Sequence, residues 1–380
     1  MKIYWITELD LNTKHKASRF ELSEALRARG HIVTLLISRK IGEKKIKNEE
    51  LIAFPTIPYP IISKFIFGMV LFFYLPFIIR NKKIEIIIII DGVDIWLPFV
   101  ISLKLFHIPL VLDIRSTTTR ESLDSILQET SLLLSKYLVD GWTTITPELK
   151  NILVNKYKIK NEKIGIWTSG VSIKNFTNQS NVDNTITKNY KIKPFILMYH
   201  GSYSPNRGIE NLILSLNKLN NSVKDKIKLL FVGFNEAQIK KLSLFCDKIN
   251  ISEKVQFIPQ VRYEEIPAYI SICDVGIIPL PPDNEWCWES SPLKTLEYLA
   301  MGKPIIATNI PFHQSIFEKG KCGVLIENSE PESIAVAISY LHENKEKLGE
   351  MGTVGRKIVE KYYTWDKKAL DLEEFINTIL

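Results

Sequence analysis

The sequence predicts an α/β protein built from two successive doubly wound domains, and three observations support this prediction. Apolar strands alternate with amphipathic helices along the chain. The strands are nearly continuous apolar runs, which is typical of a parallel sheet buried on both faces. A polar stretch near the middle divides the chain into two such series. The length of 380 residues, with 46% hydrophobic and 24% charged residues, suits two globular domains and excludes a disordered or fibrous chain.

The first series begins with a strand at 2–7 and a helix at 16–29, and Gly30 is expected to cap that helix at its C-terminal end. Three further apolar strands are expected, at 31–37, 85–90 and 109–113. This strand, helix, strand order predicts a parallel sheet with crossover helices.

The stretch Ile61–Ile79 is the most hydrophobic in the chain, although Lys64 and Pro76 interrupt it. Three interpretations are open: a helix packed on the sheet, a surface helix seated among lipid headgroups, or a membrane span. The second interpretation draws on the basic residues near this stretch, which are Lys40, Lys44, Lys45, Lys47, Arg80, Lys82 and Lys83. Peripheral membrane contact is therefore one of the expectations.

A stretch rich in Asn, Thr and Lys, at about 175–193, predicts an interdomain linker. The second series follows it. Its expected strands are 195–200, 227–232, 254–258, 275–279, 304–308 and 323–327. Its expected helices are 208–219, 235–248, 264–272, 292–301 and 331–342.

Charge and cysteine content limit the function classes. The net charge of +7 favours anionic ligands or an anionic membrane surface and is too weak to indicate a nucleic-acid partner. The four cysteines show no metal-binding spacing and are expected to be reduced and buried. The first residues lack the apolar run of a signal peptide, so a cytoplasmic location is expected.

The segment from Glu289 to Pro304 carries the strongest functional signal. Ser291 is expected to be the N-cap of a short helix, with Pro292 in its first position. The free backbone N–H groups of Leu293 and Lys294, with the Lys294 ammonium, form an anion site that suits a diphosphate. Glu289 and Glu297 can flank that anion and accept hydrogen bonds from sugar hydroxyls, or they can be an ordinary solvated pair.

The loop after the strand at 195–200 is the second signal. Its small residues let the chain approach a ligand, and Arg207 precedes the next helix. A guanidinium there can hold phosphate oxygens, or it can form a salt bridge within a surface loop.

Four sets of residues together resemble the retaining glycosyltransferases of family 4. They are Gly201 with Arg207-Gly208-Ile209-Glu210, the Glu289/Glu297 pair with its E-Y-L-A-x-G-K-P continuation, Ser169-Gly170-Val171, and Tyr363-Thr364-Trp365-Asp366. The resemblance implies the GT-B fold, which is two Rossmann-like domains facing across a cleft. It implies an acceptor-binding domain at 1–175, a linker at 176–194, a nucleotide-sugar-binding domain at 195–360, and a helix at 361–380 that returns to the first domain.

The resemblance also assigns roles. Arg207 and Lys294 would hold the donor diphosphate, Glu297 the ribose, and Glu289 hydroxyls of the transferred sugar. Family members often carry a second basic residue after the glycine at 201, where this chain has Ser202, and Lys294 is the candidate replacement. The complete donor-binding set expected is Gly201, Ser202, Arg207, Ser291, Pro292, Leu293, Lys294 and Glu297.

The first half departs further from the family pattern, because the usual glycine pair after the first strand is absent from the loop at 8–19. After the strand at 109–113 the chain reads Asp113-Ile114-Arg115, as in a subgroup of the family. Asp113 is expected to position the acceptor or steady charge at the reacting carbon, and Arg115 to contact an anionic substrate. A structural ion pair between the two is the alternative.

Two other clusters carry weaker signals. Trp286, Cys287 and Trp288 could form a wall that stacks on a sugar, or they could fill the core. The chain contains no D-x-D motif, and Asp91-Gly92-Val93-Asp94 does not match one, so neither a metal nor another cofactor is expected.

The sequence therefore predicts a metal-independent, retaining glycosyltransferase that uses a UDP- or GDP-sugar and a glycan or lipid-linked glycan acceptor. Glu289, Arg207, Lys294 and Asp113 are the expected catalytic residues. The alternatives are a non-catalytic nucleotide-sugar-binding partner and a GT-B nucleotide-sugar epimerase. A dinucleotide-dependent dehydrogenase is disfavoured because no G-x-G-x-x-G follows a predicted strand.

Overall fold

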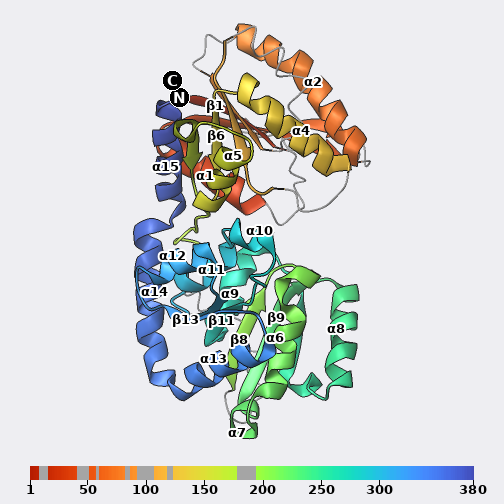
Figure 1. Cartoon of the computed structure of the whole chain (residues 1–380), viewed down its shortest axis with the longest axis vertical. Coiled ribbons are helices and arrows are strands. Elements are labelled where there is room, and N and C mark those ends of the chain that lie inside the picture. The colour runs from red at the N-terminus through yellow and green to blue at the C-terminus, as the bar shows by residue number, and fades with distance from the viewer. Residues whose placement is uncertain are drawn as a thin grey trace. The chain divides into compact units, whose positions relative to one another are not determined.

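The computed structural model describes residues 1–7, 16–40, 51–56, 60–81, 86–91, 107–117, 123–177 and 194–380 (Figure 1). These residues form two compact units. The first comprises Met1–Ser169, Glu289–Ser291 and Trp365–Leu380, and the second comprises Gly170–Trp288 and Pro292–Thr364. Most of the predicted linker, and the loop at 8–15, lie outside the described residues.

The first unit contains a seven-stranded parallel sheet in the order β3-β2-β1-β4-β5-β6-β7. Its strands are β1 (Lys2–Thr7), β2 (Ile32–Lys40), β3 (Leu51–Thr56), β4 (Ile86–Asp91), β5 (Leu110–Ile114), β6 (Gly141–Thr144) and β7 (Ile164–Ile166). The chain starts in the middle of the sheet and moves outward in both directions, which is the doubly wound arrangement that the sequence predicts.

Helices cover both faces of this sheet. They are α1 (Lys16–Ala28), α2 (Pro60–Asn81), α4 (Leu123–Leu138), α5 (Pro147–Asn155), the short 3₁₀ helix η1 (Asn161–Lys163) and α15 (Trp365–Asn377). Gly30 follows α1 with φ +90°, as expected of a glycine after a helix end. Helix α2 continues through Pro76. Phe67 of α2 and Leu132 of α4 belong to one core cluster, so both helices cover the same face. Within the part of the chain that the structure describes, no helix is long and apolar enough to cross a membrane.

The last helix, α15, packs on the opposite face. Trp142 and Ile164 belong to the core cluster under α2 and α4, and their neighbours Gly141 and Gly165 therefore face the other way. A Cβ on Gly165 would lie 2.3 Å from the ring of Phe375, which shows how closely α15 approaches the sheet. Arg29 Nε donates a 2.6 Å hydrogen bond to Glu373 and fixes the helix from its side.

The second unit contains a six-stranded parallel sheet in the order β10-β9-β8-β11-β12-β13. Its strands are β8 (Phe195–His200), β9 (Ile227–Phe234), β10 (Val255–Pro259), β11 (Val275–Ile278), β12 (Ile305–Thr308) and β13 (Gly323–Ile326). Every strand predicted in this half is present, with ends that differ by two residues at most.

The helices of the second unit are α6 (Ile209–Ser215), α7 (Asn221–Lys224), α8 (Glu236–Lys248), α9 (Ile266–Ile272), α10 (Glu285–Trp288), α11 (Leu293–Ala300), α12 (Pro311–Phe317), α13 (Pro331–Glu343) and α14 (Leu348–Tyr362). Short 3₁₀ helices lie at η3 (Pro205–Arg207), η4 (Leu216–Lys218), η5 (Ser252–Lys254), η6 (Tyr263–Glu265) and η7 (Lys345–Lys347). Two core clusters form the interior of this unit.

Candidate active site

The end of β8 and the start of α11 lie next to each other in the second unit. Gly201, directly after β8, has φ +118°, a conformation that a side chain would strain. A Cβ at this position would lie 3.2 Å from Lys294 Nζ, so the missing side chain leaves room for the ammonium. The same ammonium lies 3.8 Å from the ring centroid of Tyr199. The structure thus brings Lys294 to the loop in which Ser202 replaces the usual basic residue.

Arg207 ends η3, which lies in the same loop. Gly208 follows with φ +68°, and a Cβ there would lie 1.9 Å from the carbonyl oxygen of Pro279, so only glycine fits the turn. The guanidinium of Arg207 stacks on the ring of Trp286 at 4.5 Å from the centroid. A planar cation supported on an aromatic face keeps its N–H groups available for an anion.

Glu297, inside α11, is 3% exposed. Its Oε1 accepts a 2.9 Å hydrogen bond from the hydroxyl of Tyr263, and its Oε2 lies 3.3 Å from His200 Nε2. Burial raises the pKa of Glu297 to about 7, although the Tyr263 hydrogen bond and the charge of Lys294 both act to lower it. This carboxyl group can therefore change its charge near neutral pH.

Buried contacts fix the position of α11. The hydroxyl of Thr295 lies 3.0 Å from His313 Nε2, and His313 Nδ1 lies 2.7 Å from the carbonyl oxygen of Thr308. Burial lowers the pKa of His313 to about 4, so the ring is neutral and can donate at one nitrogen and accept at the other. Tyr298 donates a 2.8 Å hydrogen bond to the carbonyl oxygen of Met198 on β8. The two contacts fix the orientation of α11, which carries Glu297 between them and Lys294 directly before Thr295.

The predicted start of α11 is wrong by one residue. Pro292 is the N-cap, and the helix begins at Leu293. The hydroxyl of Ser291 does not cap the helix, because it accepts a 3.1 Å hydrogen bond from the backbone N–H of Ser169. Ser169 Oγ in turn donates to the carbonyl oxygen of Ser291, so the two serines are paired within the first unit.

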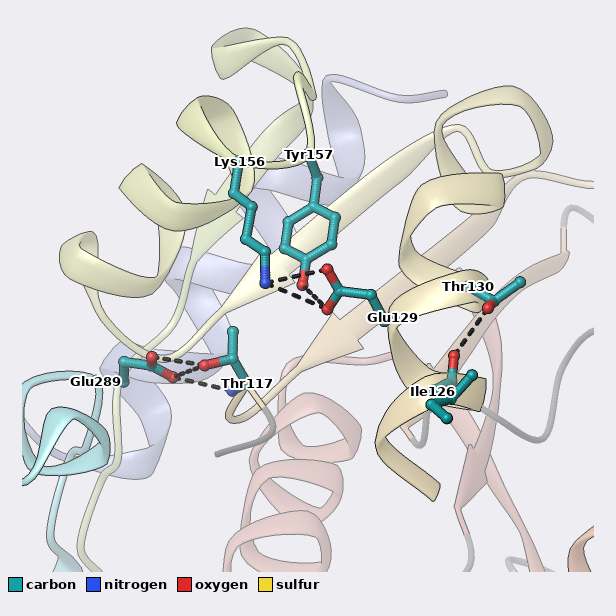
Figure 2. A network of polar contacts seen from close by, with 7 residues as sticks. All are labelled: Thr117, Ile126, Glu129, Thr130, Lys156, Tyr157 and Glu289. Carbon is teal, nitrogen blue, oxygen red and sulfur yellow. Dashed lines mark hydrogen bonds and ion pairs between the residues drawn. The ribbon is translucent and has the colours of Figure 1, made fainter. Parts of the chain in front are cut away.

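Glu289 belongs to the first unit, whereas Glu297 belongs to the second. Glu289 is 5% exposed, and Thr117 contacts both of its carboxylate oxygens, as Figure 2 shows. The backbone N–H of Thr117 donates to Oε2 at 2.9 Å, and its hydroxyl lies 2.6 Å from Oε1 and 2.9 Å from Oε2. Thr146 Oγ1 donates a 3.2 Å hydrogen bond to the backbone oxygen of Glu289.

Asp113 lies within β5, and Arg115 directly follows the end of that strand. Asp113 is 1% exposed and accepts a 2.7 Å hydrogen bond from the hydroxyl of Thr143. Arg115 Nε lies 3.9 Å from Asp113 Oδ2, at the outer limit of an ion pair. The guanidinium of Arg115 stacks on Trp167 at 3.7 Å from the ring centroid, so its plane is fixed by the aromatic ring.

A second network in Figure 2 supports the fold around these residues. Tyr157 donates a 2.7 Å hydrogen bond to Glu129 of α4, and Lys156 Nζ lies 3.0 Å from the same carboxylate. Burial raises the pKa of Tyr157 to about 12, so the phenol stays protonated and continues to donate. This network joins α4 to the end of α5.

The aromatic cluster before Glu289 has mixed roles. Cys287 is fully buried, and the other three cysteines are also free and buried, as predicted. Trp286 supports Arg207, whereas Trp288 is 46% exposed and donates its indole N–H to the carbonyl oxygen of Pro282 at 2.5 Å. Among the described residues, no group of three or more His, Cys, Asp or Glu is arranged to hold a metal ion.

Three residues of the site were not predicted. His200 is the last residue of β8, and Thr117 lies shortly after the end of β5. Tyr263 lies in η6, which follows β10. A signal for all three was present, since ligand-binding residues in open parallel sheets lie beyond the carboxyl ends of the strands. Which residues contact Glu289 and Glu297 depends on the positions of β5 and α11 in the tertiary structure, and the sequence spacing does not indicate those positions.

Two family models match the chain. Residues 182–358 match "Glycosyl transferases group 1", and residues 19–175 match "Glycosyltransferase Family 4". Together the two segments cover most of the sequence.

Named relatives are similar over shorter segments. A GDP-mannose-dependent alpha-(1-6)-phosphatidylinositol monomannoside mannosyltransferase of Mycobacterium tuberculosis is 26% identical over 175 residues, which are 45% of this chain and 44% of that protein. A D-inositol 3-phosphate glycosyltransferase of Paenarthrobacter aurescens is 22% identical over 243 residues, which are 63% of this chain and 58% of that protein. The chain thus matches about half the length of these relatives.

Solved structures resemble the chain over its whole length. Anabaena Alr3699/HepE in complex with UDP has a TM-score of 0.77 at 14% identity, with 100% of both chains covered. Sucrose-phosphate synthase from Thermosynechococcus elongatus has a TM-score of 0.77 at 17% identity, with 100% of this chain and 98% of that chain covered. With two parallel Rossmann-like sheets, these matches show that the chain has the GT-B fold and belongs to the family 4, group 1 glycosyltransferases.

Proposed function

We propose that this protein is a retaining, metal-independent glycosyltransferase that transfers a sugar from a UDP- or GDP-sugar to a hydroxyl of a glycan or lipid-linked glycan. The main support for the proposal is the position of two side chains of α11. Lys294 lies at Gly201, and the buried Glu297, three residues further on, lies between Tyr263 and His200. A cation and a hydrogen-bond acceptor at this separation match the diphosphate and the ribose of one nucleotide.

The donor would be held at two points, its diphosphate and its ribose. Lys294, Arg207 and the backbone N–H groups at the start of α11 bind the diphosphate, with Gly201 and Ser202 lining the loop beside it. Glu297 accepts hydrogen bonds from the ribose hydroxyls. The stacking of Arg207 on Trp286 and the buried contacts of α11 support this role, because a preorganised site does not spend binding energy on ordering its side chains.

The same cations would assist the reaction. As the bond from the sugar C1 to the phosphate oxygen breaks, negative charge grows on the departing diphosphate, and fixed cations stabilise that charge more than they stabilise the bound donor. In a retaining transfer the acceptor hydroxyl attacks C1 from the face that the phosphate leaves, and its proton passes to the departing phosphate. No nucleophile from the protein is then required.

Residues of the first unit would serve the sugar and the acceptor. For Glu289 we propose contact with hydroxyls of the transferred sugar, and for Asp113 we propose positioning of the acceptor hydroxyl. Arg115 would contact an anionic group of the acceptor. The fixed planes and partners of these side chains support the proposal, because Thr117, Thr143 and Trp167 hold one of them each.

The proposed reaction uses no cofactor, and we expect it to take place in the cytoplasm. The direct test of metal independence is transfer activity in excess EDTA compared with activity in Mg²⁺. Equal rates support the proposal, and activity that returns only with the metal contradicts it.

The experiment that tests the donor site is thermal unfolding with UDP-, GDP- and ADP-sugars in EDTA. A donor present at ~100 times its Kd should stabilise the wild-type protein by about 2.7 kcal/mol. The stabilisation should fall to about 0.4–1.4 kcal/mol in Glu297→Ala, as a 10- to 100-fold increase in Kd requires. It should persist in Glu332→Ala, a matched change of an exposed glutamate on α13.

The products of the stabilising donor then distinguish the remaining functions. Transfer to an acceptor with the anomeric configuration kept, read by NMR, supports the proposal. Inversion, epimerised free donor, or binding without turnover on a panel of glycan and lipid-linked acceptors would contradict it. Folded protein that no donor stabilises would contradict the site itself.

A further inference from the structure

The proposed function uses Glu297 but not the histidine beside it. His200, the last residue of β8, is 5% exposed, and its Nε2 lies 3.3 Å from Oε2 of Glu297. We call these two residues the buried pair. Two groups that can each carry a charge therefore meet at ion-pair distance inside the second unit, where burial makes an unbalanced charge costly.

Tyr298 fixes the imidazole of His200 from one side. The two ring centroids lie 4.9 Å apart, and the Tyr298 hydroxyl donates a 2.8 Å hydrogen bond to the carbonyl oxygen of Met198. The Tyr298 ring also lies against Gly276 of β11, where an added Cβ would come within 2.3 Å of it. The imidazole is thus held against α11, the helix that carries Glu297.

A lysine, two phenols and a thiol surround the buried pair. Lys294 and Tyr298 lie on α11, and Tyr263 of η6 donates a 2.9 Å hydrogen bond to Oε1 of Glu297. Tyr298 interacts electrostatically with Cys273. Burial raises the pKa of Tyr298 well above its ordinary value and the pKa of Cys273 to about 12, so both groups stay neutral. The charge of Lys294 favours the ionised form of Glu297.

One proton makes the buried pair neutral, and that proton can lie on either residue. In the first form Glu297 is protonated at Oε2, and neutral His200 accepts at Nε2 and carries its own proton at Nδ1. In the second form a carboxylate lies beside an imidazolium. Burial, which raises the pKa of Glu297 to about 7, favours the first form in the free protein. Ribose hydroxyls favour the second form, because a carboxylate offers them more acceptor positions than a protonated carboxyl group does.

We propose that His200 is a positioning residue of the donor site, which takes the proton of Glu297 when the ribose of the donor binds. The O–H bond at Oε2 breaks, its electron pair stays on the carboxylate, and an N–H bond forms at Nε2. The buried pair remains neutral, so the ribose meets an ionised acceptor and no proton passes to water. This inference rests on the proposed function, because it takes a ribose as the ligand of Glu297.

Calorimetric titration at about pH 6 tests the inference, because it measures how many protons binding releases. The enthalpy of donor binding is compared in PIPES and in bis-tris, two buffers with different enthalpies of ionisation. UDP- and GDP-sugars are the ligands, because their diphosphate lacks the terminal phosphate ionisation, with a pKa of about 6, of a free nucleotide.

The wild-type protein should release less than about 0.2 proton per bound donor at this pH. A Glu297 side chain that acts alone, with a pKa of about 7, would instead release about 0.9 proton. Release of more than about half a proton by the wild type would overturn the inference, and this measurement needs no variant.

His200→Gln removes the base and keeps a polar side chain. This variant should release more than about half a proton at about pH 6 and bind the donor about five- to tenfold more weakly than the wild type. The difference should fall to within about twofold at about pH 8, where Glu297 is already ionised. His342→Gln, at another buried histidine of the second unit, is the matched control and should behave as the wild type does.

A merely structural role for His200 would lower the affinity equally at both pH values, and that result would overturn the inference. Thermal unfolding shows whether the variant is folded, and the wild-type proton release decides the question if it is not. Failure of every donor to bind the wild type would contradict the proposed function, and this inference with it. A donor that binds the wild type with release of a proton contradicts this inference alone.

Discussion

Glu289 and Glu297 lie eight positions apart in one motif, but the two units surround them differently. Glu289 lies in the first unit, where a backbone amide and a hydroxyl from Thr117 engage both of its oxygens. Glu297 lies in the second unit, with a phenol at one oxygen, an imidazole at the other, and burial that raises its pKa to about 7. Similar burial therefore does not produce similar chemistry, because the partners decide what each carboxyl group can do.

The largest effect is expected from removing the cation beside Glu297. Lys294→Ala should lower kcat by about 100- to 1000-fold, because a fixed charge aimed at the leaving group acts mainly in the transition state. Steady-state kinetics measure the change, and Lys240→Ala, an exposed lysine of α8, is the matched control. A kcat within twofold of the wild type would show that Lys294 does not serve the leaving group.

A second effect concerns the pH dependence of stability. The pKa of Glu297 in the folded state, about 7, lies above its ordinary value of 4.5, so the protonated form favours folding. This contribution is fully present below about pH 4.5 and is lost as the pH rises through 7. The amide side chain that Glu297→Gln introduces stays neutral at every pH. The free energy of unfolding of the variant, relative to that of the wild type, should therefore increase by up to about 3 kcal/mol between pH 4.5 and 8.

Chemical denaturation at several pH values measures that difference. The wild-type and Glu297→Gln proteins should differ increasingly toward alkaline pH. Parallel curves across this range would contradict the raised pKa, and with it the contrast between the two glutamates.

A smaller effect is expected at Glu289. Thr117→Val removes the hydroxyl that contacts both carboxylate oxygens and keeps the backbone N–H. We expect a loss of roughly tenfold in kcat/KM, equal to about 1.4 kcal/mol, with Thr117→Ser close to the wild type. The affinity for the free nucleotide should not change, and a loss of that affinity would mean that the two carboxyl groups act on the same part of the donor.

The smallest effect is expected at Tyr263. Its hydroxyl lowers the pKa of Glu297, so Tyr263→Phe should raise that pKa further and shift the pH profile of donor affinity to higher pH. The Kd at neutral pH should increase by about two- to fivefold, because one hydrogen bond is worth about 1 kcal/mol or less. Calorimetric titrations from pH 6 to 9 measure the profile, and an unchanged midpoint would exclude Tyr263 as a positioning residue.

Much of the fold could be predicted from apolar runs and helix spacing. The strands of the second unit were predicted with close ends because each is a short apolar run flanked by turns. Strands β3, β6 and β7 were missed. Leu51–Thr56 contains a proline, Gly141–Thr144 and Ile164–Ile166 are short, and β6 is largely polar. Helix α4 was missed as well, because its apolar residues lie on both its buried and its exposed face and obscure the spacing that marks an amphipathic helix.

The site was predictable in part for a related reason. Lys294, Glu297 and Arg207 lie within strong local signals, and the structure places Lys294 at Gly201 as expected. The start of α11 was not predictable, because Ser291 pairs with Ser169, a residue 122 positions away. Contacts between residues far apart in the sequence, such as those of Thr117 with Glu289, depend on the tertiary fold.

Calorimetric titration of UDP and GDP, without any sugar, into the wild-type, Glu297→Ala and Glu289→Ala proteins in EDTA tests the central claim most directly. If Glu297 binds the ribose and Glu289 contacts the transferred sugar, Glu297→Ala should weaken one of the nucleotides by about 10- to 100-fold, while Glu289→Ala leaves its Kd within twofold. Equal losses in both variants, or an unchanged Kd in Glu297→Ala, would contradict the account.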